Sequence, residues 1–168
     1  MSRLVIKLML LLLCAWSSNS FAEPSIALLD FELSDLTSLP NTPAEKQRTA
    51  SVRPLLEQAL RQQGNYPILP IPADTQSYAN PGFGYLFNHE DLAAELGAKL
   101  GADWIIVGRH SKPSYLYSHL MVKLVQVNQP SLVIDLDVEL KGNHEKVMQR
   151  SVNSLANKIH LALVKYHR

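Results

Sequence analysis

The sequence predicts an α/β domain on one mixed β-sheet of about five strands, preceded by an export signal. Three observations predict this fold. Apolar runs of strand length first alternate with amphipathic helical segments, which is typical of parallel strands joined by helices. Two longer segments, 114–127 and 131–141, then alternate between polar and apolar residues around a short turn and indicate an antiparallel hairpin. An amphipathic stretch over about 143–166 completes the order β-α-β-α-β-β-β-α.

The first 22 residues have the three parts of a secretory signal peptide. Arg3 and Lys7 give a positively charged start, and an apolar run extends from Leu8 to Trp16. Small residues before and at Ala22 then fit the positions that a signal peptidase recognises. We therefore expect cleavage after Ala22 and a single periplasmic domain over residues 23–168.

Charge and cysteine content limit the possible functions. The signal contains two of the 16 basic residues, none of the 15 acidic residues and the only cysteine, Cys14. The mature domain is therefore nearly neutral, which argues against nucleic acid or an anionic membrane as its main partner. It has no disulfide, thiol nucleophile or cysteine-based metal site. An uncleaved anchor and lipidation at Cys14 are alternatives, but the apolar run is short and Leu13 is larger than a lipoprotein site requires.

The first strand is expected over 25–33, where a continuous apolar run is typical of a strand covered on both faces. A helix over 42–63 follows. Thr42 is its expected cap and Glu45 the partner that would close a capping box. Because Pro54 lies inside this helix, the sequence predicts a kink or a break just before it.

A second short strand is expected over 66–71, at a sheet edge, because prolines surround it. The segment 73–87 shows neither helical nor strand periodicity and is predicted to be a long loop. Asn88 is the expected cap of a helix over 90–100. A buried parallel strand is then expected over 103–108.

The hairpin register follows from its three-residue turn, which is expected to pair Val127 with Ser131. This register places apolar residues opposite one another on one face: Leu120 with Val138, Val122 with Leu136, and Leu124 with Ile134. On the polar face it pairs Tyr117 with Lys141, His119 with Glu139, Met121 with Asp137, and Lys123 with Asp135. Opposite charges then lie across from each other, which supports the register.

Three stretches carry a resemblance to a known domain: 26–31, 96–108 and the hairpin end at 138–142. They resemble the envelope domain shared by the TolB amino-terminal domain, the CsgG secretion proteins and the LpoB-type lipoprotein activators. The resemblance covers most of residues 25–165. It implies a binding or assembly module without catalytic activity.

A narrower resemblance lies in Phe31-Glu32-Leu33, in Gly108-Arg109 and in the segment 138–143. These residues are similar to a family of uncharacterised secreted bacterial proteins, often encoded near periplasmic alcohol dehydrogenases that use pyrroloquinoline quinone. The resemblance implies an accessory role and assigns no functional residue. The mature chain lacks the central-loop cysteines of some relatives, which argues against a metal or redox task that uses them.

Exposed aromatic residues are the candidates for contact with a protein partner, because such residues are enriched at interface hot spots. The predicted loop contains Tyr78, Phe83, Tyr85 and Phe87. The polar hairpin face adds Tyr115 and Tyr117 to its paired charges. The alternative for the loop is that its aromatic side chains fold back onto the core.

A basic cluster, Arg109, His110 and Lys112, is expected in a loop after the third strand. Ligands of open α/β sheets bind beyond the carboxyl ends of parallel strands, so this cluster is a candidate site for an anionic ligand such as a carboxylated quinone. His119 with Glu139 is a candidate metal-binding pair. A solvated loop and a simple cross-strand pair are the structural alternatives. Because no metal-binding histidine spacing is present, we predict no metal and no cofactor.

The sequence therefore predicts a non-enzymatic periplasmic accessory protein that binds another envelope protein. The narrower resemblance makes a quinoprotein dehydrogenase or its maturation machinery the expected partner. A carrier of a small ligand or a metal is the alternative. A hydrolase is the least favoured hypothesis, because the carboxylates at strand ends (Asp30, Glu32 and Asp103) have no visible nucleophile beside them and no G-x-S-x-G motif is present.

Overall fold

A computed structural model of the chain describes residues 23–72, 74–142 and 145–166. The predicted signal peptide and Cys14 lie outside these residues. Within them, no helix has the length and apolar character needed to cross a membrane. The helices are α2 (Pro43–Ala50), α3 (Val52–Gly64), α4 (Thr75–Ala79), α5 (Tyr85–Asn88), α6 (Glu90–Leu100) and α7 (Glu145–Tyr166).

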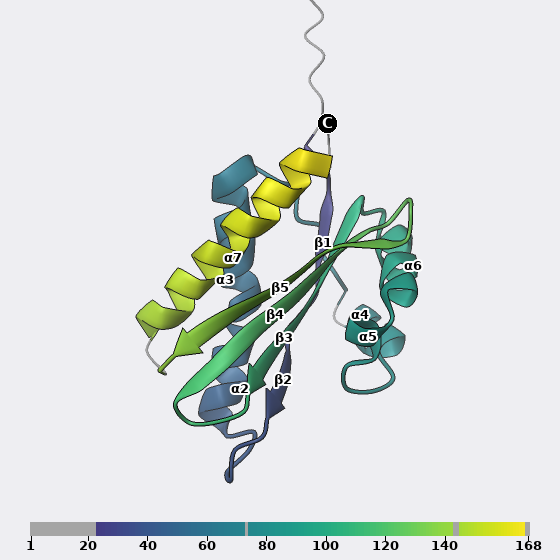
Figure 1. Cartoon of the computed structure of the whole chain (residues 1–168). Helices are drawn as coiled ribbons and strands as arrows, with labels where there is room; N and C mark the ends of the chain where they lie inside the picture. Colours follow the sequence, from purple (N-terminus) through teal and green to yellow (C-terminus); the bar gives the residue numbers. More distant parts are fainter. Residues whose placement is uncertain (1–22, 73, 143–144, 167–168) are drawn as a thin grey trace, which may run out of the picture.

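The five strands form the single mixed sheet that the sequence predicts. They are β1 (Ile26–Leu28), β2 (Glu32–Asp35), β3 (Trp104–Lys112), β4 (Tyr117–Gln126) and β5 (Ser131–Lys141). Both β1 and β2 pair in parallel with β3, and β4 and β5 continue the sheet in antiparallel orientation. Helices α3 and α7 lie on one side of the sheet, while α4, α5 and α6 lie on the other (Figure 1).

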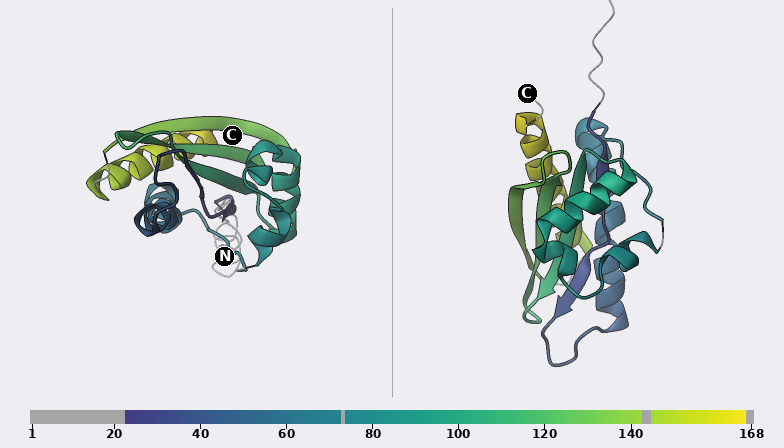
Figure 2. Two further views of the ribbon diagram at one scale, coloured as in Figure 1. Left: turned by 90° about the horizontal axis from the view of Figure 1, so that it is seen from below. Right: turned by 90° about the vertical axis from the view of Figure 1, so that its right-hand side faces the viewer.

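Two hydrophobic cores result, one on each side of the sheet. The larger core joins α3 and α7 to side chains such as Leu120, Val122 and Leu124 of β4. The smaller core joins α5 and α6 to Ile105, Val107 and Val125. The right-hand view of Figure 2 looks onto α6, with strands of the sheet behind it. Because strand side chains alternate between faces, neighbouring residues of β3 belong to different sides of the molecule.

The predicted first strand is interrupted, since β1 and β2 are separated at 29–31. The cause is a side chain distant in sequence. The backbone N–H of Asp30 donates to Gln76 Oε1 at 2.8 Å, and the Gln76 amide donates to the Asp30 carbonyl at 3.0 Å. The backbone of Asp30 is thus bonded to Gln76 between the two strands.

The predicted break before Pro54 is confirmed, because α2 ends at Ala50 and α3 begins at Val52. Thr42 caps α2, with its hydroxyl oxygen accepting from the Glu45 N–H at 3.3 Å. The prediction that Glu45 closes a capping box is wrong, because its carboxylate pairs with the buried Lys112 instead.

Other elements differ from the expectation. The segment 66–71 forms only an isolated bridge between Ile68 and β1. The segment 73–87 is not a structureless loop, because it contains α4 and part of α5. Asn88 ends α5, and α6 begins after His89, which makes no side-chain capping bond. The third strand continues to Lys112, four residues beyond its predicted end at 108.

The predicted hairpin register is confirmed for every pair from Tyr117–Lys141 to Leu124–Ile134. Only its turn end is wrong, because an irregularity between Leu124 and Val125 pairs Gln126, not Val127, with Ser131. The polar–apolar alternation therefore fixed the side-chain faces correctly along most of the hairpin.

Gly108 in β3 lies directly against the Phe31 ring. A Cβ atom at this position would lie 2.4 Å from two ring carbons, so we expect Gly108→Ala to reduce the free energy of unfolding by about 1–3 kcal/mol through overpacking. Urea denaturation would measure this loss. Gly82→Ala is the matched control, because no atom lies within 4 Å of its added Cβ. Equal effects of the two substitutions would contradict this account of Gly108.

Candidate functional site

Three exposed aromatic side chains gather on the segment that contains α4 and α5. Tyr78 is 86% exposed, Phe83 60% and Tyr85 36%. We call these three residues the aromatic surface. Tyr78 and Tyr85 line a groove of about 670 Å³ between this segment and α6. Its apolar walls are completed by Pro72, Ala79, Pro81, Leu92, Leu96 and Leu100.

A network of hydrogen bonds holds this segment to the sheet. The Glu32 carboxylate accepts from the Gly84 N–H at 2.9 and 3.1 Å and from the Asn80 amide at 2.7 Å. Asn80 in turn accepts from the Leu86 N–H at 3.2 Å. The aromatic surface is therefore presented by an anchored segment, and Glu32 has a structural task there.

Phe87 differs from the other aromatic residues of the segment, because it is buried in the smaller core. Its ring lies 4.3 Å from the guanidinium carbon of Arg109. Phe87 thus follows the alternative given for this segment, in which an aromatic side chain folds back onto the core. A partner would contact Tyr78, Phe83 and Tyr85 before it reached Phe87.

The basic cluster does not form one loop site. Arg109, His110 and Lys112 belong to β3, where Arg109 pairs with Met121 of β4 and with Glu32 of β2. Alternation along the strand sends Arg109 to the side of α5, while His110 and Lys112 lie on the side of α2. The prediction that these residues follow the strand is thus wrong, and the five predicted ligand-binding residues are divided between two faces.

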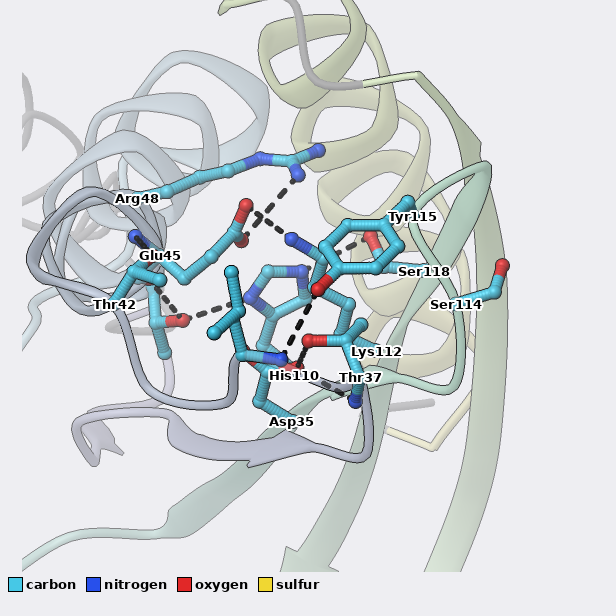
Figure 3. A network of polar contacts seen from close by, with 12 residues as sticks. Asp35, Thr37, Thr42, Glu45, Arg48, His110, Lys112, Ser114, Tyr115 and Ser118 are labelled. Carbon is cyan, nitrogen blue, oxygen red and sulfur yellow. Dashed lines mark hydrogen bonds and ion pairs between the residues drawn. The ribbon is translucent and has the colours of Figure 1, made fainter.

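His110 and Lys112 belong to a buried polar network, which Figure 3 shows. His110 is fully buried, with Nδ1 2.7 Å from the Thr49 hydroxyl and Nε2 3.0 Å from the Ser118 hydroxyl. The Lys112 ammonium donates to Glu45, whose other carboxylate oxygen lies 3.6 Å from Arg48. We call Glu45, Arg48, Thr49, His110, Lys112 and Ser118 the buried network.

The buried network joins α2 to the sheet and keeps His110 neutral near pH 7. Burial lowers the pKa of His110 to about 4, and the positive charges of Arg48 and Lys112 act in the same direction. These effects outweigh the carboxylates of Glu45 and Asp35, which act in the opposite direction. Since His110 already has a partner on each ring nitrogen, its contacts are those of a structural residue.

Tyr115 covers one end of the buried network. Its hydroxyl lies 3.0 Å from the Ser38 hydroxyl and accepts from the Leu39 N–H at 3.1 Å. Its ring lies 5.5 Å from the Lys112 nitrogen. Tyr115 lies in the connection between β3 and β4, so its predicted place on the polar hairpin face is wrong. It ties this connection to the segment after β2, although half of the side chain is exposed.

Asp35 organises the turn that follows β2. It accepts from the Thr37 N–H and hydroxyl and from the Asn41 N–H. Burial raises the pKa of Asp35, but these hydrogen bonds and the nearby Lys112 outweigh burial and leave the pKa below its ordinary value. The carboxylate is thus held ionised beside the buried network.

The polar hairpin face keeps its predicted register but uses different side-chain partners. His119 pairs with Asp137 at 2.8 Å, diagonal to its backbone partner Glu139, which lies 3.5 Å from Lys141. Lys123 reaches Glu90 of α6 at 2.7 Å. No group of three or more potential ligands suited to a metal occurs in the described ranges. The ring of Tyr117 makes a T-shaped contact with the His119 ring and stays 40% exposed.

The remaining strand-end carboxylates also have structural partners. Asp30 forms an ion pair with Arg53 at 3.2 Å. Asp103 accepts from both the backbone N–H and the hydroxyl of Ser25, at 2.8 and 2.7 Å. Together with Glu32, these contacts account for all three carboxylates that were weighed as catalytic candidates.

Comparison with solved structures finds proteins of similar fold. PelC from Paraburkholderia phytofirmans, a dodecamer, matches with a TM-score of 0.51 at 14% identity over 84% of this chain and 87% of its own. TolB from Acinetobacter baumannii matches with a TM-score of 0.51 at 12% identity over 83% of this chain and 28% of its own. The LpoB carboxyl-terminal domain from Salmonella enterica matches with a TM-score of 0.49 at 14% identity, over 79% of this chain and 93% of its own.

The PelC and TolB matches define the chain as an α/β domain with the fold that these two structures share, and the resemblance to TolB is confirmed at the level of the fold. The chain belongs to the family described as "Protein of unknown function (DUF2380)", whose pattern matches residues 24–159. No curated protein matches it. The link to quinoprotein dehydrogenases stays a prediction.

Proposed function

We propose that this chain is a non-enzymatic accessory protein of the bacterial periplasm that binds another envelope protein through its aromatic surface. The observation that carries the proposal is the exposure of Tyr78, Phe83 and Tyr85 beside an apolar groove. Exposed Tyr and Phe side chains next to a groove are typical of protein-binding sites, where aromatic anchors provide most of the affinity.

The anchoring of the segment supports this proposal. Because Glu32 and Asn80 hold the backbone around Gly84, the aromatic side chains need little ordering when a partner binds. The structural partners of Asp30, Glu32 and Asp103 support the absence of catalytic activity, because none of them is left as a free acid or base. The fold shared with TolB and PelC is compatible with an envelope location.

The location and the narrower partner are part of the same proposal. The signal-like sequence over residues 1–22 supports export, cleavage after Ala22 and a mature domain over 23–168. The quinoprotein dehydrogenase system is the partner that the family resemblance favours.

Capture from native periplasm tests the proposal. The mature chain, tagged at its carboxyl end, is incubated with periplasmic extract, and the bound proteins are identified by mass spectrometry. We expect one envelope protein in a roughly stoichiometric amount. A quinoprotein dehydrogenase would support the narrower form, and a different envelope protein would replace it. Absence of any specific protein would contradict the proposal.

The double substitution Tyr78→Ala and Tyr85→Ala is expected to reduce partner capture by about tenfold or more, because it removes two anchors of the groove. The thermal midpoint should change little, since both side chains are largely outside the cores. Tyr166→Ala on α7 is the matched control and should bind normally. Phe87 is unsuitable for this test because its truncation would open the smaller core.

A further inference from the structure

We infer that Arg109 is the anion-binding residue of the aromatic surface, and that the segment of the partner protein that docks there presents a carboxylate to it. This inference rests on the proposed function and adds the chemistry of the partner. It arises from an arginine that two aromatic rings hold in place and whose N–H groups have no acceptor among the described residues.

Two aromatic rings hold the Arg109 guanidinium. Its central carbon lies 4.9 Å from the centre of the Phe83 ring and 4.3 Å from the centre of the Phe87 ring. Contacts of this kind favour the planar cation over the ring faces. Phe83 belongs to the aromatic surface and Phe87 to the smaller core, so the guanidinium lies between the surface and the interior.

Gly84 brings the backbone close to the same group. Its φ of +74° belongs to the left-handed region, and an added Cβ would lie 2.4 Å from one terminal nitrogen of Arg109. Glycine satisfies both requirements, because it adopts this conformation without strain and leaves room for the guanidinium. The local sequence Phe83-Gly84 therefore supplies one ring and the space beside it.

The guanidinium lacks an acceptor within the part of the chain that the structure describes. Its Nε atom is buried without a hydrogen-bond partner. The terminal nitrogens likewise have no hydrogen bond or ion pair to any described residue. Arginine has five N–H donors, and buried donors without acceptors are uncommon in native proteins. The terminal nitrogens are not among the buried donors of the described residues, so an external acceptor can reach them.

No carboxylate of the described residues forms an ion pair with Arg109, and three charged groups on this side of the sheet have other partners. Glu32, the backbone partner of Arg109 on β2, accepts from Gly84 and Asn80. Lys123 is paired with Glu90, and His119 with Asp137. The charge of Arg109 therefore has no dedicated counter-ion among these groups, and an incoming anion would not have to displace one.

A carboxylate on a protein segment fits this position best. The guanidinium fork matches a carboxylate through two parallel hydrogen bonds, and the exposed Phe83 ring requires an apolar neighbour that an inorganic anion lacks. The nearly neutral charge balance of residues 23–168 argues against nucleic acid or an anionic membrane as the source of the anion. A Glu or Asp side chain flanked by apolar residues supplies both the carboxylate for Arg109 and the apolar contact for Phe83.

The arginine side-chain signals in a nitrogen–proton NMR spectrum test the inference. The probes are the peptide acetyl-Leu-Glu-Leu-amide and its Gln counterpart. We expect the Glu peptide to shift the Arg109 Nε–H signal in a saturable manner, and the Gln peptide to bind about tenfold or more weakly, since charge-assisted bonds are lost. The Arg53 Nε–H signal is the internal control, because Arg53 already pairs with Asp30.

Two variants complete the test, each checked for a preserved backbone spectrum. Arg109→Gln should abolish saturable binding, whereas Arg109→Lys should retain part of it, because lysine keeps the charge without the planar fork. Undiminished binding by Arg109→Gln, or equal binding of the two peptides, would overturn the inference. Inorganic phosphate binding at Arg109 more tightly than the Glu peptide would also overturn it.

The peptide-binding test at Arg109 and the partner-capture test of the proposed function can fail independently. If the Glu peptide fails to bind while substitution of Tyr78 and Tyr85 still removes partner capture, the role of Arg109 is wrong and the proposed function stands. If the peptide binds at Arg109 but those substitutions leave partner capture unchanged, the proposed function fails and the anion site stands.

Discussion

Substitution of Lys112 by methionine is expected to lower the free energy of unfolding by about 3 kcal/mol, measured by urea denaturation. The Lys112 side chain is buried, and its ammonium group is paired with Glu45 between α2 and β3. Removing it leaves a buried carboxylate whose remaining ion-pair partner among the described residues is Arg48, at 3.6 Å (Figure 3). The cost arises from the uncompensated charge of Glu45.

Two further variants separate this cause from a general effect of the substitution. Lys141→Met removes an exposed pair with Glu139 at 3.5 Å and should cost less than about 1 kcal/mol. The double variant Lys112→Met and Glu45→Met should recover much of the loss, because no buried carboxylate remains. A Lys112→Met protein as stable as Lys141→Met would contradict the importance of the buried pair.

Acidification is expected to destabilise the domain through His110 by about 3 kcal/mol, because its pKa is about 4 in the folded chain and its ordinary value is 6.5. The unfolded chain therefore binds a proton in a range where folded His110 stays neutral. This contribution to stability is fully present above pH 6.5 and is lost as the pH falls towards 4. Burial is the main cause, followed by the nearby Arg48.

Comparison with His110→Gln isolates this contribution. The free energy of unfolding is measured for both proteins between pH 7 and pH 4, and carboxylates that titrate equally in the two proteins cancel in the difference. Glutamine can replace the hydrogen bonds to Thr49 and Ser118 but does not titrate. We expect a clearly smaller loss of stability in the variant. Parallel curves for the two proteins would contradict a buried neutral His110.

The parts of the fold that follow a strong period could be predicted from the sequence. Alternation along β4 and β5 gave the register of Tyr117 with Lys141 and of Leu124 with Ile134. Pro54 indicated the break between α2 and α3, because proline is accepted in the first turn of a helix but not within it. These features depend on residues close in sequence.

Features that depend on distant partners could not be predicted. The interruption between β1 and β2 requires Gln76, whose amide occupies the backbone groups of Asp30. Helices α4 and α5 have only five and four residues, too few to show a helical period. The extension of β3 from residue 108 to Lys112 could not be predicted, because His110 and Lys112 lie at interior positions where polar residues are uncommon.

Only part of the candidate site could be predicted, because some of its features depend on residues distant in sequence. Composition alone singled out the segment with Tyr78, Phe83 and Tyr85, and these side chains are at least partly exposed. The burial of Phe87 depends on the smaller core and on Arg109, which no local pattern indicates. The buried network was missed because Glu45 was assigned to a capping box. A longer β3 would have placed His110 and Lys112 on one face.

Site-specific photo-crosslinking tests the central proposal, that the aromatic surface contacts an envelope protein, most directly. A photoreactive phenylalanine analogue replaces Tyr85 in one protein and Tyr166, on α7, in the other, and both are irradiated in intact cells. We predict one discrete adduct of higher mass at position 85, containing an envelope protein, and none at position 166. Adducts at position 166 alone, or at neither position, would contradict the proposal.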